Sequence, residues 1–212
     1  MLRDEKMSLQ VPVVILANGQ FPSHPTPLQH LWQANTLICT DGSYHHLSDR
    51  GLEPTYIIGD MDSVQESRVK APHSLVMVDN QNNTDMAKAL DWCLAKKIRQ
   101  ATLLGCTGLR EDHHLANLLL MAHYHQKIAL QAITDHCVIT CVEGTHTLES
   151  HPGQIVSLIA LEGSPRITTH HLQYPVFNQS LRDASNGISN LSTANNITLT
   201  TDGPLFVFQQ HR

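Results

Sequence analysis

Short apolar runs alternate with segments of helical spacing over the first two-thirds of the chain, and this alternation limits the folds open to it. Five runs have the length of buried strands: residues 11–17, 36–40, 55–58, 101–104 and 130–134.

Thr84 is placed to cap a helix whose apolar residues recur at three- and four-residue intervals from Met86 to Leu94. A second helix is expected to start near His114, with an apolar face made of Leu115, Leu118, Leu119 and Ala122. Strands that alternate with helices predict an α/β domain with crossover connections.

The pattern changes after about residue 136, where short runs rich in Val, Ile, Thr and Phe are separated by Gly, Pro, Asn and Asp. The last of these runs, residues 196–208, alternates and turns at Asp202-Gly203. We therefore predict two domains. Residues 8–135 form an α/β domain, Rossmann-like, with a mostly parallel sheet and helices on both faces, and residues 136–212 form an all-β sandwich.

The overall charge argues against a partner held by its phosphate backbone. Lys and Arg total 14 against 19 for Asp and Glu, which gives a formal net charge of −5 over 212 residues. A protein of this charge repels polyanions, so we expect no nucleic acid partner. Any phosphate that it binds needs a few placed cations or a metal ion.

Several features predict a cytoplasmic protein. The longest nearly apolar stretch, residues 115–122, is far shorter than the roughly 20 residues of a membrane-spanning helix, so no membrane is expected as a partner. The N-terminus has no apolar core of a secretory signal. The five cysteines are odd in number and lack a C-x-x-C pair, which favours free thiols. The histidine pairs do not have the spacing of zinc ligands.

Two aspartates follow the apolar run at residues 55–58, in Gly59-Asp60-Met61-Asp62-Ser63. In extended chain, residues i and i+2 point to the same side, so Asp60 and Asp62 can present two carboxylates together. Paired carboxylates at the carboxyl end of a parallel strand suit Mg²⁺, which takes oxygen ligands and keeps waters or substrate phosphates on its other positions. Taken alone, the segment also fits a solvated Asp-rich turn.

Other charged residues occupy equivalent places. Asp41 follows the run at 36–40, Asp85 lies on the first turn of the helix capped by Thr84, and Asp112 is expected just before the next helix. Each alone fits an ordinary cap or a complement to the helix dipole, but together they bring carboxylates to the edge of a parallel sheet where ligands bind. Lys88 and Arg110 supply cations for phosphate oxygens. Neither a G-x-x-x-x-G-K-[ST] loop nor a G-x-G-x-x-G motif occurs.

These residues fall within motifs that resemble the thiamine pyrophosphokinase family. The motifs occur in the family's order over nearly the whole chain: LANG at 16–19, DG at 41–42, IIGDMDS at 57–63, TDMAKAL at 84–90, GCTGLREDHHLAN at 105–117 and GISN at 187–190. The resemblance implies transfer of the pyrophosphoryl group of ATP to the hydroxyl of thiamine, which gives thiamine diphosphate and AMP. It also implies a homodimer whose active site lies between the α/β domain of one chain and the β domain of the other.

The resemblance assigns a role to each matched position. The residues expected to hold Mg²⁺ and the triphosphate are Asp41, Asp60, Asp62 and Asp85. The residues expected around ATP are Asp41, Ser63, Thr84, Lys88, Arg110 and Asp112. Ser189 and Asn190 would bind thiamine. Asp60, Asp62, Asp85 and Asp112 are the candidate catalytic residues, and Asp85 or Asp112 could accept the proton of the thiamine hydroxyl.

One motif departs from the family pattern. The family usually continues the DG pair as DGGAN, whereas this chain has Asp41-Gly42-Ser43-Tyr44-His45. Two alternatives to the transferase stay open, and only the second of them is raised by this departure. A metal-dependent phosphohydrolase could use the same carboxylates with water as acceptor, and a protein with weakened catalysis could bind thiamine or nucleotide without turnover. Elsewhere, Trp32 and Trp92 lie on apolar helical faces and are expected in the core or at an interface.

Overall fold

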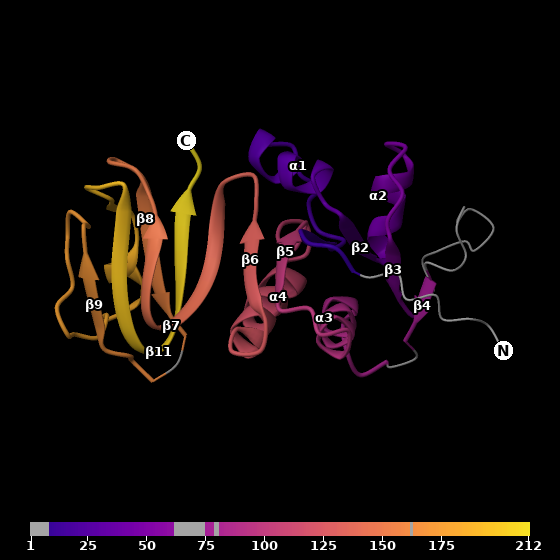
Figure 1. Ribbon diagram of the computed structural model, residues 1–212. Helices are drawn as coiled ribbons and strands as arrows, with labels where there is room; N and C mark the ends of the chain where they lie inside the picture. The colour runs from indigo at the N-terminus through magenta and orange to yellow at the C-terminus, as the bar shows by residue number, and fades with distance from the viewer. Residues whose placement is uncertain (1–8, 62–74, 79–80, 162) are drawn as a thin grey trace.

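The structure is a computed structural model that describes residues 9–61, 75–78, 81–161 and 163–212. Its first part is a parallel sheet in the order β6-β5-β1-β2-β3-β4 (Figure 1). The strands are β1 (Val13–Leu16), β2 (Thr36–Thr40), β3 (Tyr56–Gly59), β4 (Leu75–Met77), β5 (Gln100–Leu104) and β6 (Ala129–Ile133). Five of them match the apolar runs of the sequence. The sixth, β4, was not predicted, because three partly exposed residues at a sheet edge leave little apolar signal.

Helices cover both faces of this sheet, as the sequence predicts. They are α1 (Pro25–Trp32), α2 (Tyr44–Ser48), α3 (Asp85–Ala95) and α4 (Glu111–Tyr124). Figure 1 shows α1 and α2 on one side and α3 and α4 on the other. Alternate residues of β1 serve the two cores: Val13 and Ile15 join the cluster beneath α3 and α4, while Val14 and Leu16 join the cluster beneath α1 and α2. A strand buried on both faces is apolar throughout, which explains the unbroken runs.

Helix α4 differs from its prediction in two ways. It begins at Glu111, so Asp112 lies in its first turn and not before it. The expected apolar face is also wrong in part, because Leu115 is 60% exposed and Leu119 is 50% exposed. The helix buries Asn117 instead, together with two residues further along. The spacing of the leucines indicates an apolar stripe along the helix. It does not show which side of the helix packs on the sheet.

The two tryptophans have different environments. Trp32, at the end of α1, is 56% exposed, so it is not in the core of this chain. The ring of Trp92 packs on the ring of Tyr56, with centroids 4.7 Å apart, and lies against the main apolar cluster as expected. No described helix is long and apolar enough to cross a membrane.

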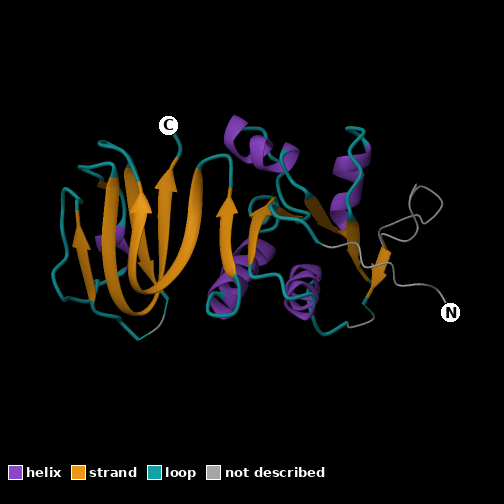
Figure 2. Ribbon diagram, viewed as in Figure 1, coloured by secondary structure: helices purple, strands orange, loops and turns teal. Residues whose placement is uncertain are grey.

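The strands after residue 136 are antiparallel and continue the same sheet (Figure 2). They are β7 (Cys137–Glu149), β8 (Ile155–Ala160), β9 (Ile167–His170), β10 (Asn190–Leu191) and β11 (Asn196–Gln210), with a 3₁₀ turn η4 (Ala184–Gly187) before β10. β7 pairs antiparallel with β6, and the order continues as β7-β11-β8-β10. The all-β character is as predicted, whereas the continuity with the parallel sheet was not foreseen.

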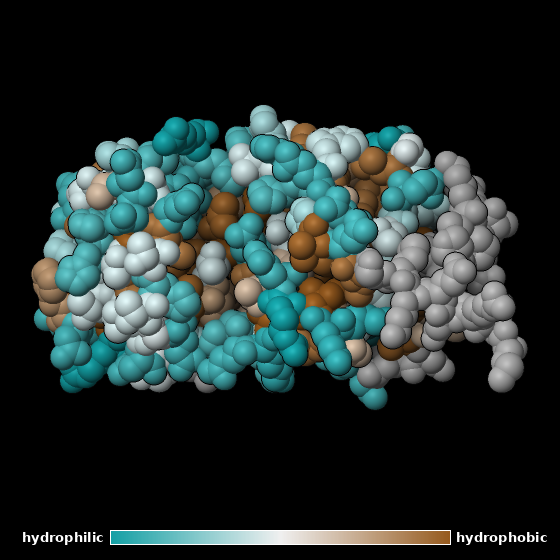
Figure 3. Space-filling model, viewed as in Figure 1, coloured by the Kyte–Doolittle hydropathy of each residue, from teal (hydrophilic) through white to brown (hydrophobic). Residues whose placement is uncertain are grey.

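The long strand β11 organises this second part. Its register against β7 shifts between Thr201 and Leu205, which is the bulge or irregularity expected where a strand bends. Before the shift it also pairs with β9, and after the shift with β8. The two halves enclose an apolar cluster that includes Val156, Ile167 and Leu199. On the face drawn in Figure 3, apolar surface gathers over the middle of the molecule, between the β-rich end and the helices.

Candidate active site

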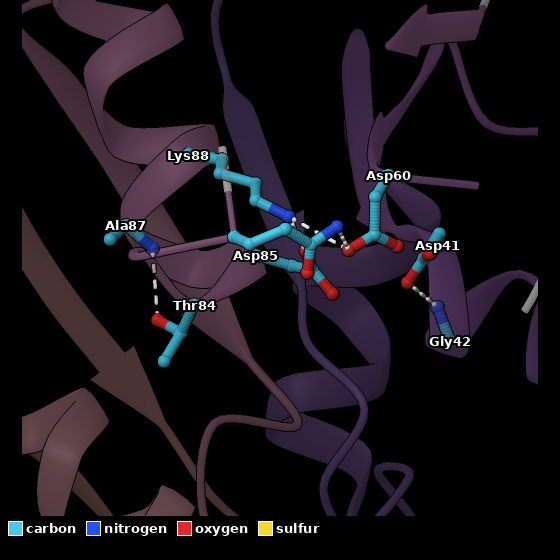
Figure 4. Close-up of polar contacts among 8 residues, drawn as sticks. Asp41, Gly42, Asp60, Thr84, Asp85, Ala87 and Lys88 are labelled. Atoms are coloured by element: carbon cyan, nitrogen blue, oxygen red, sulfur yellow. Dashed lines mark hydrogen bonds and ion pairs between the residues drawn. The ribbon is translucent and has the colours of Figure 1, made fainter. Parts of the chain in front are cut away.

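The carboxylates at the carboxyl ends of the parallel strands come together, as the sequence predicts. Asp41 directly follows β2 and begins the 3₁₀ turn η1 (Asp41–Ser43), and Asp60 directly follows β3. Asp85 is the first residue of α3, whose cap Thr84 accepts a hydrogen bond from the backbone N–H of Ala87 at 3.4 Å. Figure 4 shows the three carboxylates turned toward one another. The strand ends and the helix start therefore form one acidic cluster.

Lys88 lies inside this cluster. Its side chain is 2% exposed, and its ammonium donates hydrogen bonds to Asp85 Oδ1 at 2.9 Å and to Asp60 Oδ2 at 3.2 Å. Burial acts to lower the pKa of Lys88, but the hydrogen bonds and charges of Asp85 and Asp60 outweigh it and raise this pKa. Lys88 therefore stays protonated and links β3 to α3.

Asp41 is the most buried of the carboxylates, at 3% exposed. Burial raises its pKa to about 6, with further contributions from the neighbouring Asp85 and the charge of Asp60, while the Gly42 N–H acts in the opposite direction. Gly59 makes room for it, because a Cβ at that position would lie 2.7 Å from Asp41 Cγ. The cluster thus carries repulsion between carboxylates that one ammonium does not fully relieve.

A cavity of about 340 Å³ opens beside the cluster. Of the residues expected to bind ATP, Asp41, Thr84 and Arg110 line it, and so does Asp85, which was expected to hold the metal ion. The lining also includes residues without a predicted role: Asn18, Cys106, His113, His114 and Asn117. Most of them lie within the quoted motifs LANG and GCTGLREDHHLAN, so the signal that could have identified them was present in the sequence.

Arg110 and Asp112 pair with each other at the rim. The Arg110 guanidinium donates to both carboxylate oxygens of Asp112, at 3.1 and 2.6 Å, and both side chains are well exposed. The hydrogen bonds from Arg110, followed by that from the His113 N–H, lower the pKa of Asp112 to about 2. Asp112 is not among the residues that line the cavity.

The predicted thiamine residues lie far from this cluster within one chain. Asn190 begins β10, and five strands separate β10 from β1 in the sheet order. The Asn190 amide pairs with the backbone of Tyr174, accepting from its N–H at 3.0 Å and donating to its carbonyl at 2.7 Å. Ser189 precedes it with φ at 59°. A single chain does not bring Ser189 and Asn190 to the cavity.

Two predicted site residues, Asp62 and Ser63, lie outside the described residues. Among the residues that are described, no group of three or more His, Cys, Asp or Glu side chains is arranged to hold a metal ion. The ammonium of Lys88 bridges Asp60 and Asp85.

Comparison with known proteins gives consistent results. The family model described as "Thiamin pyrophosphokinase, catalytic domain" matches residues 28–132, and that described as "Thiamin pyrophosphokinase, vitamin B1 binding domain" matches residues 145–206. The thiamine pyrophosphokinase of Bacillus subtilis is 36% identical over 80 residues, which cover 35% of this chain and 37% of that protein. Thiamin pyrophosphokinase 1 of Caenorhabditis elegans is 28% identical over 116 residues, which cover 50% of this chain and 48% of that protein. The matches thus span less than half the length of these curated relatives.

Solved structures show the same fold over nearly the whole chain. The crystal structure of thiamine pyrophosphokinase from Bacillus subtilis has a TM-score of 0.79 at 25% identity and covers 94% of this chain and 99% of that one. The thiamin pyrophosphokinase from Candida albicans has the same TM-score at 14% identity, covering 94% and 89% of the two chains.

The fold and the site together define an α/β enzyme. Its carboxylates and a lysine lie at the carboxyl edge of a parallel sheet, and the same sheet continues into an all-β part. Both family models, which match consecutive parts of the chain, describe thiamin pyrophosphokinase. The chain belongs to the thiamin pyrophosphokinase family.

Proposed function

We propose that this protein transfers the pyrophosphoryl group of ATP to the hydroxyl of thiamine and releases thiamine diphosphate and AMP. The observation that carries the proposal is the cluster of Asp41, Asp60 and Asp85 around the buried Lys88, beside a cavity of about 340 Å³. The family membership supports the reaction, and the cluster supplies the charged groups that it needs.

Mg²⁺ is the metal ion whose preferred ligand type these carboxylates supply, although the described residues are not by themselves arranged around a metal ion. Asp41, Asp60, Asp85 and the neighbouring Asp62 would hold it, because carboxylate oxygens are its preferred protein ligands. Burial is the first cause of the raised pKa of Asp41 and the charge of Asp85 is the second, and a bound divalent cation would relieve the second cause. When bound, the ion neutralises phosphate charge as the pyrophosphoryl group is transferred.

The protein's own residues divide the remaining tasks. Arg110, at the rim of the cavity, contributes a guanidinium for phosphate oxygens, and Lys88 keeps Asp60 and Asp85 in place. Asp85 accepts the proton of the thiamine hydroxyl in this proposal, since it lines the cavity and Asp112 does not.

The thiamine side belongs to a second copy of the chain in this proposal. Five strands lie between β1 and β10, which begins at Asn190 directly after Ser189, so these two residues can complete the site of a homodimer partner more readily than their own. The exposed Leu115 and Leu119 on α4 offer apolar surface for such a partner.

Domain roles and location complete the proposal. Residues 8–135 act as a Rossmann-like domain for phosphate chemistry, and residues 136–212 act as a β-sandwich domain for thiamine binding and dimerisation. All five cysteines are free thiols, which supports a cytoplasmic location.

The test is product analysis by chromatography after incubation with ATP, Mg²⁺ and thiamine. We expect AMP and thiamine diphosphate in equal amounts, with neither formed when thiamine is omitted or the metal is chelated. Phosphate release without thiamine would identify a phosphohydrolase. Binding of substrates without any product would identify a catalytically weakened protein, and ADP would rule out pyrophosphoryl transfer.

A further inference from the structure

Ser43 is the first of the three positions at which this chain departs from the family's DGGAN pattern, and it is fully buried at 0% exposed. Its hydroxyl oxygen lies 2.8 Å from the carbonyl of Leu16 and 2.8 Å from the carbonyl of Thr40, so that its one proton is shared between them. The hydroxyl of Thr40 in turn donates to Ser43 Oγ at 3.3 Å. A glycine at this position would make none of these contacts.

These contacts join the ends of two neighbouring strands. Leu16 is the last residue of β1 and Thr40 the last of β2, and the two strands are parallel, with Leu16 opposite Cys39. Residues 17–19 follow β1, residues 40–42 end β2 and enter η1, and both segments line the cavity. Ser43, which does not itself line the cavity, therefore links two segments of the cavity wall.

The two segments also touch directly. A Cβ on Gly42 would lie 2.5 Å from Asn18 Nδ2, so there is no free space between them. Asp41 lies between Thr40 and Gly42 in the same segment. Interiors packed at this density transmit a small shift of one group to its neighbours, and a change at Ser43 will therefore move Asp41 relative to Asn18.

We infer that Ser43 is a positioning residue that fixes Asp41 and the segment after β1 for the binding of the ATP phosphates. The inference rests on the proposed function, in which Asp41 faces the metal ion and the triphosphate. It also gives the first altered residue of the DG motif a structural role, because its buried hydroxyl supplies a link that the usual glycine lacks.

The kinetic test compares Ser43→Ala with Ser43→Thr, which keeps the hydroxyl. Because misplacement of a reacting group by about 1 Å can cost up to about 100-fold, we expect Ser43→Ala to lower kcat/KM for ATP about 10-fold. The KM for thiamine should stay within about two-fold, and Ser43→Thr should recover most of the loss. Ser43→Cys, close to serine in size but a weak donor, should fall between the two.

The matched control is Thr36→Val at the opposite end of β2. Thr36 is also buried, and its hydroxyl donates to the carbonyl of Gln10 at 2.9 Å. This variant should lose thermal stability but keep its kinetic constants. The inference would be overturned if Ser43→Ala and Thr36→Val lost kcat/KM for ATP to the same extent. It would also be overturned if the kinetic constants of Ser43→Ala were unchanged.

A second measurement does not depend on activity. Backbone amide resonances of residues 17–19 should shift in Ser43→Ala and return toward their wild-type positions in Ser43→Thr. Unmoved resonances would overturn the coupling between the two segments. If the wild type makes no thiamine diphosphate while the resonances shift, the proposed function fails but the mechanical link through Ser43 stands.

Discussion

A single ammonium faces three carboxylates in the acidic cluster. Lys88 contacts Asp60 and Asp85, and Asp41 lies close enough to both aspartates for their charges to raise its pKa. A buried lysine is stable only when it is paired, and here it has two partners. When either aspartate is replaced, Lys88 stays paired with the other. The fold should therefore survive a substitution that removes one of the negative charges proposed for catalysis.

The first prediction follows from this redundancy. Asp60→Asn and Asp85→Asn should each lower turnover by at least about 100-fold, because in the proposed site each removes a negative ligand of a metal ion that would supply several kcal/mol of charge stabilisation. Circular dichroism should show a folded protein. Asp49→Asn, at an exposed carboxylate just after α2, is the control and should be fully active. Near-normal turnover of both cluster variants would show that these carboxylates serve only the ion pairs with Lys88.

A second prediction concerns Tyr124 on α4, whose hydroxyl donates to Asp91 Oδ1 at 2.6 Å. Burial, followed by the hydrogen bond and charge of Asp91, raises the pKa of Tyr124 to about 12, above the value of about 10 for an unfolded chain. The protonated hydroxyl therefore stabilises the fold below about pH 10, and its contribution is lost as the pH rises from about 10 to about 12.

Urea unfolding of the wild type and Tyr124→Phe checks this sign. At pH 7 the variant should be less stable by about 1 kcal/mol, the usual contribution of one hydrogen bond, and the difference should shrink above about pH 10. Tyr174→Phe, at a tyrosine that is 65% exposed, serves as the control. If the difference in the free energy of unfolding between the wild type and Tyr124→Phe stayed constant up to pH 11, the stabilising role of the protonated Tyr124 hydroxyl would be contradicted.

At the scale of residues, the sequence predicted the acidic cluster because spacing after each strand places carboxylates at one sheet edge. It did not predict that Lys88 would pair with Asp60, because this contact joins residues 28 apart in the sequence. It also gave no sign that Asp112 would pair with Arg110 at the rim, since that depends on where α4 begins.

At the scale of elements, α4 presents part of its predicted apolar face to solvent. Leu115 and Leu119 are one turn apart and both at least half exposed, whereas the polar Asn117 is buried and donates to the carbonyl of Cys106 at 2.9 Å. Amphipathic spacing therefore predicted the helix, but could not tell a stripe that packs on the sheet from one that is left for a partner. The strands were easier to predict, because burial on both faces leaves an unbroken apolar run.

A third prediction tests the role of this stripe. The double variant Leu115→Gln, Leu119→Gln should remain folded but shift from dimer to monomer in light scattering, and its activity should fall with dilution. Trp32→Gln is the matched control, because Trp32 is equally exposed but lies on the opposite face of the sheet. A double variant that stays dimeric and active would remove α4 from the interface.

At the scale of the whole molecule, the two halves of the predicted site lie in different parts of one sheet. The sequence order of the motifs could not show this separation, because it depends on strand order. β10, which carries Asn190, lies near one end of the sheet order, and β1 to β3 lie toward the other.

The fourth prediction is a mixing experiment. Asp60→Asn and Asn190→Ala should each be nearly inactive as homodimers. When subunits exchange, random pairing makes about half of the dimers mixed, and in each of these one site collects both defects while the other collects neither. Activity should then recover to roughly a quarter of the wild-type value on this arithmetic. With exchange verified by mass spectrometry, no recovery would place both residues in a site within one chain.

The pairing of β11 has a consequence for biosynthesis. This strand spans Asn196–Gln210, and it is the partner of β7, β8 and β9. The described strands of the parallel sheet have all been made once residue 133 has emerged from the ribosome, whereas the antiparallel part lacks its central strand until residues 196–210 have been made. The edge of β7 that pairs with β11 therefore stays unpaired while residues 150–195 are being made, and an unpaired strand edge can pair with other chains.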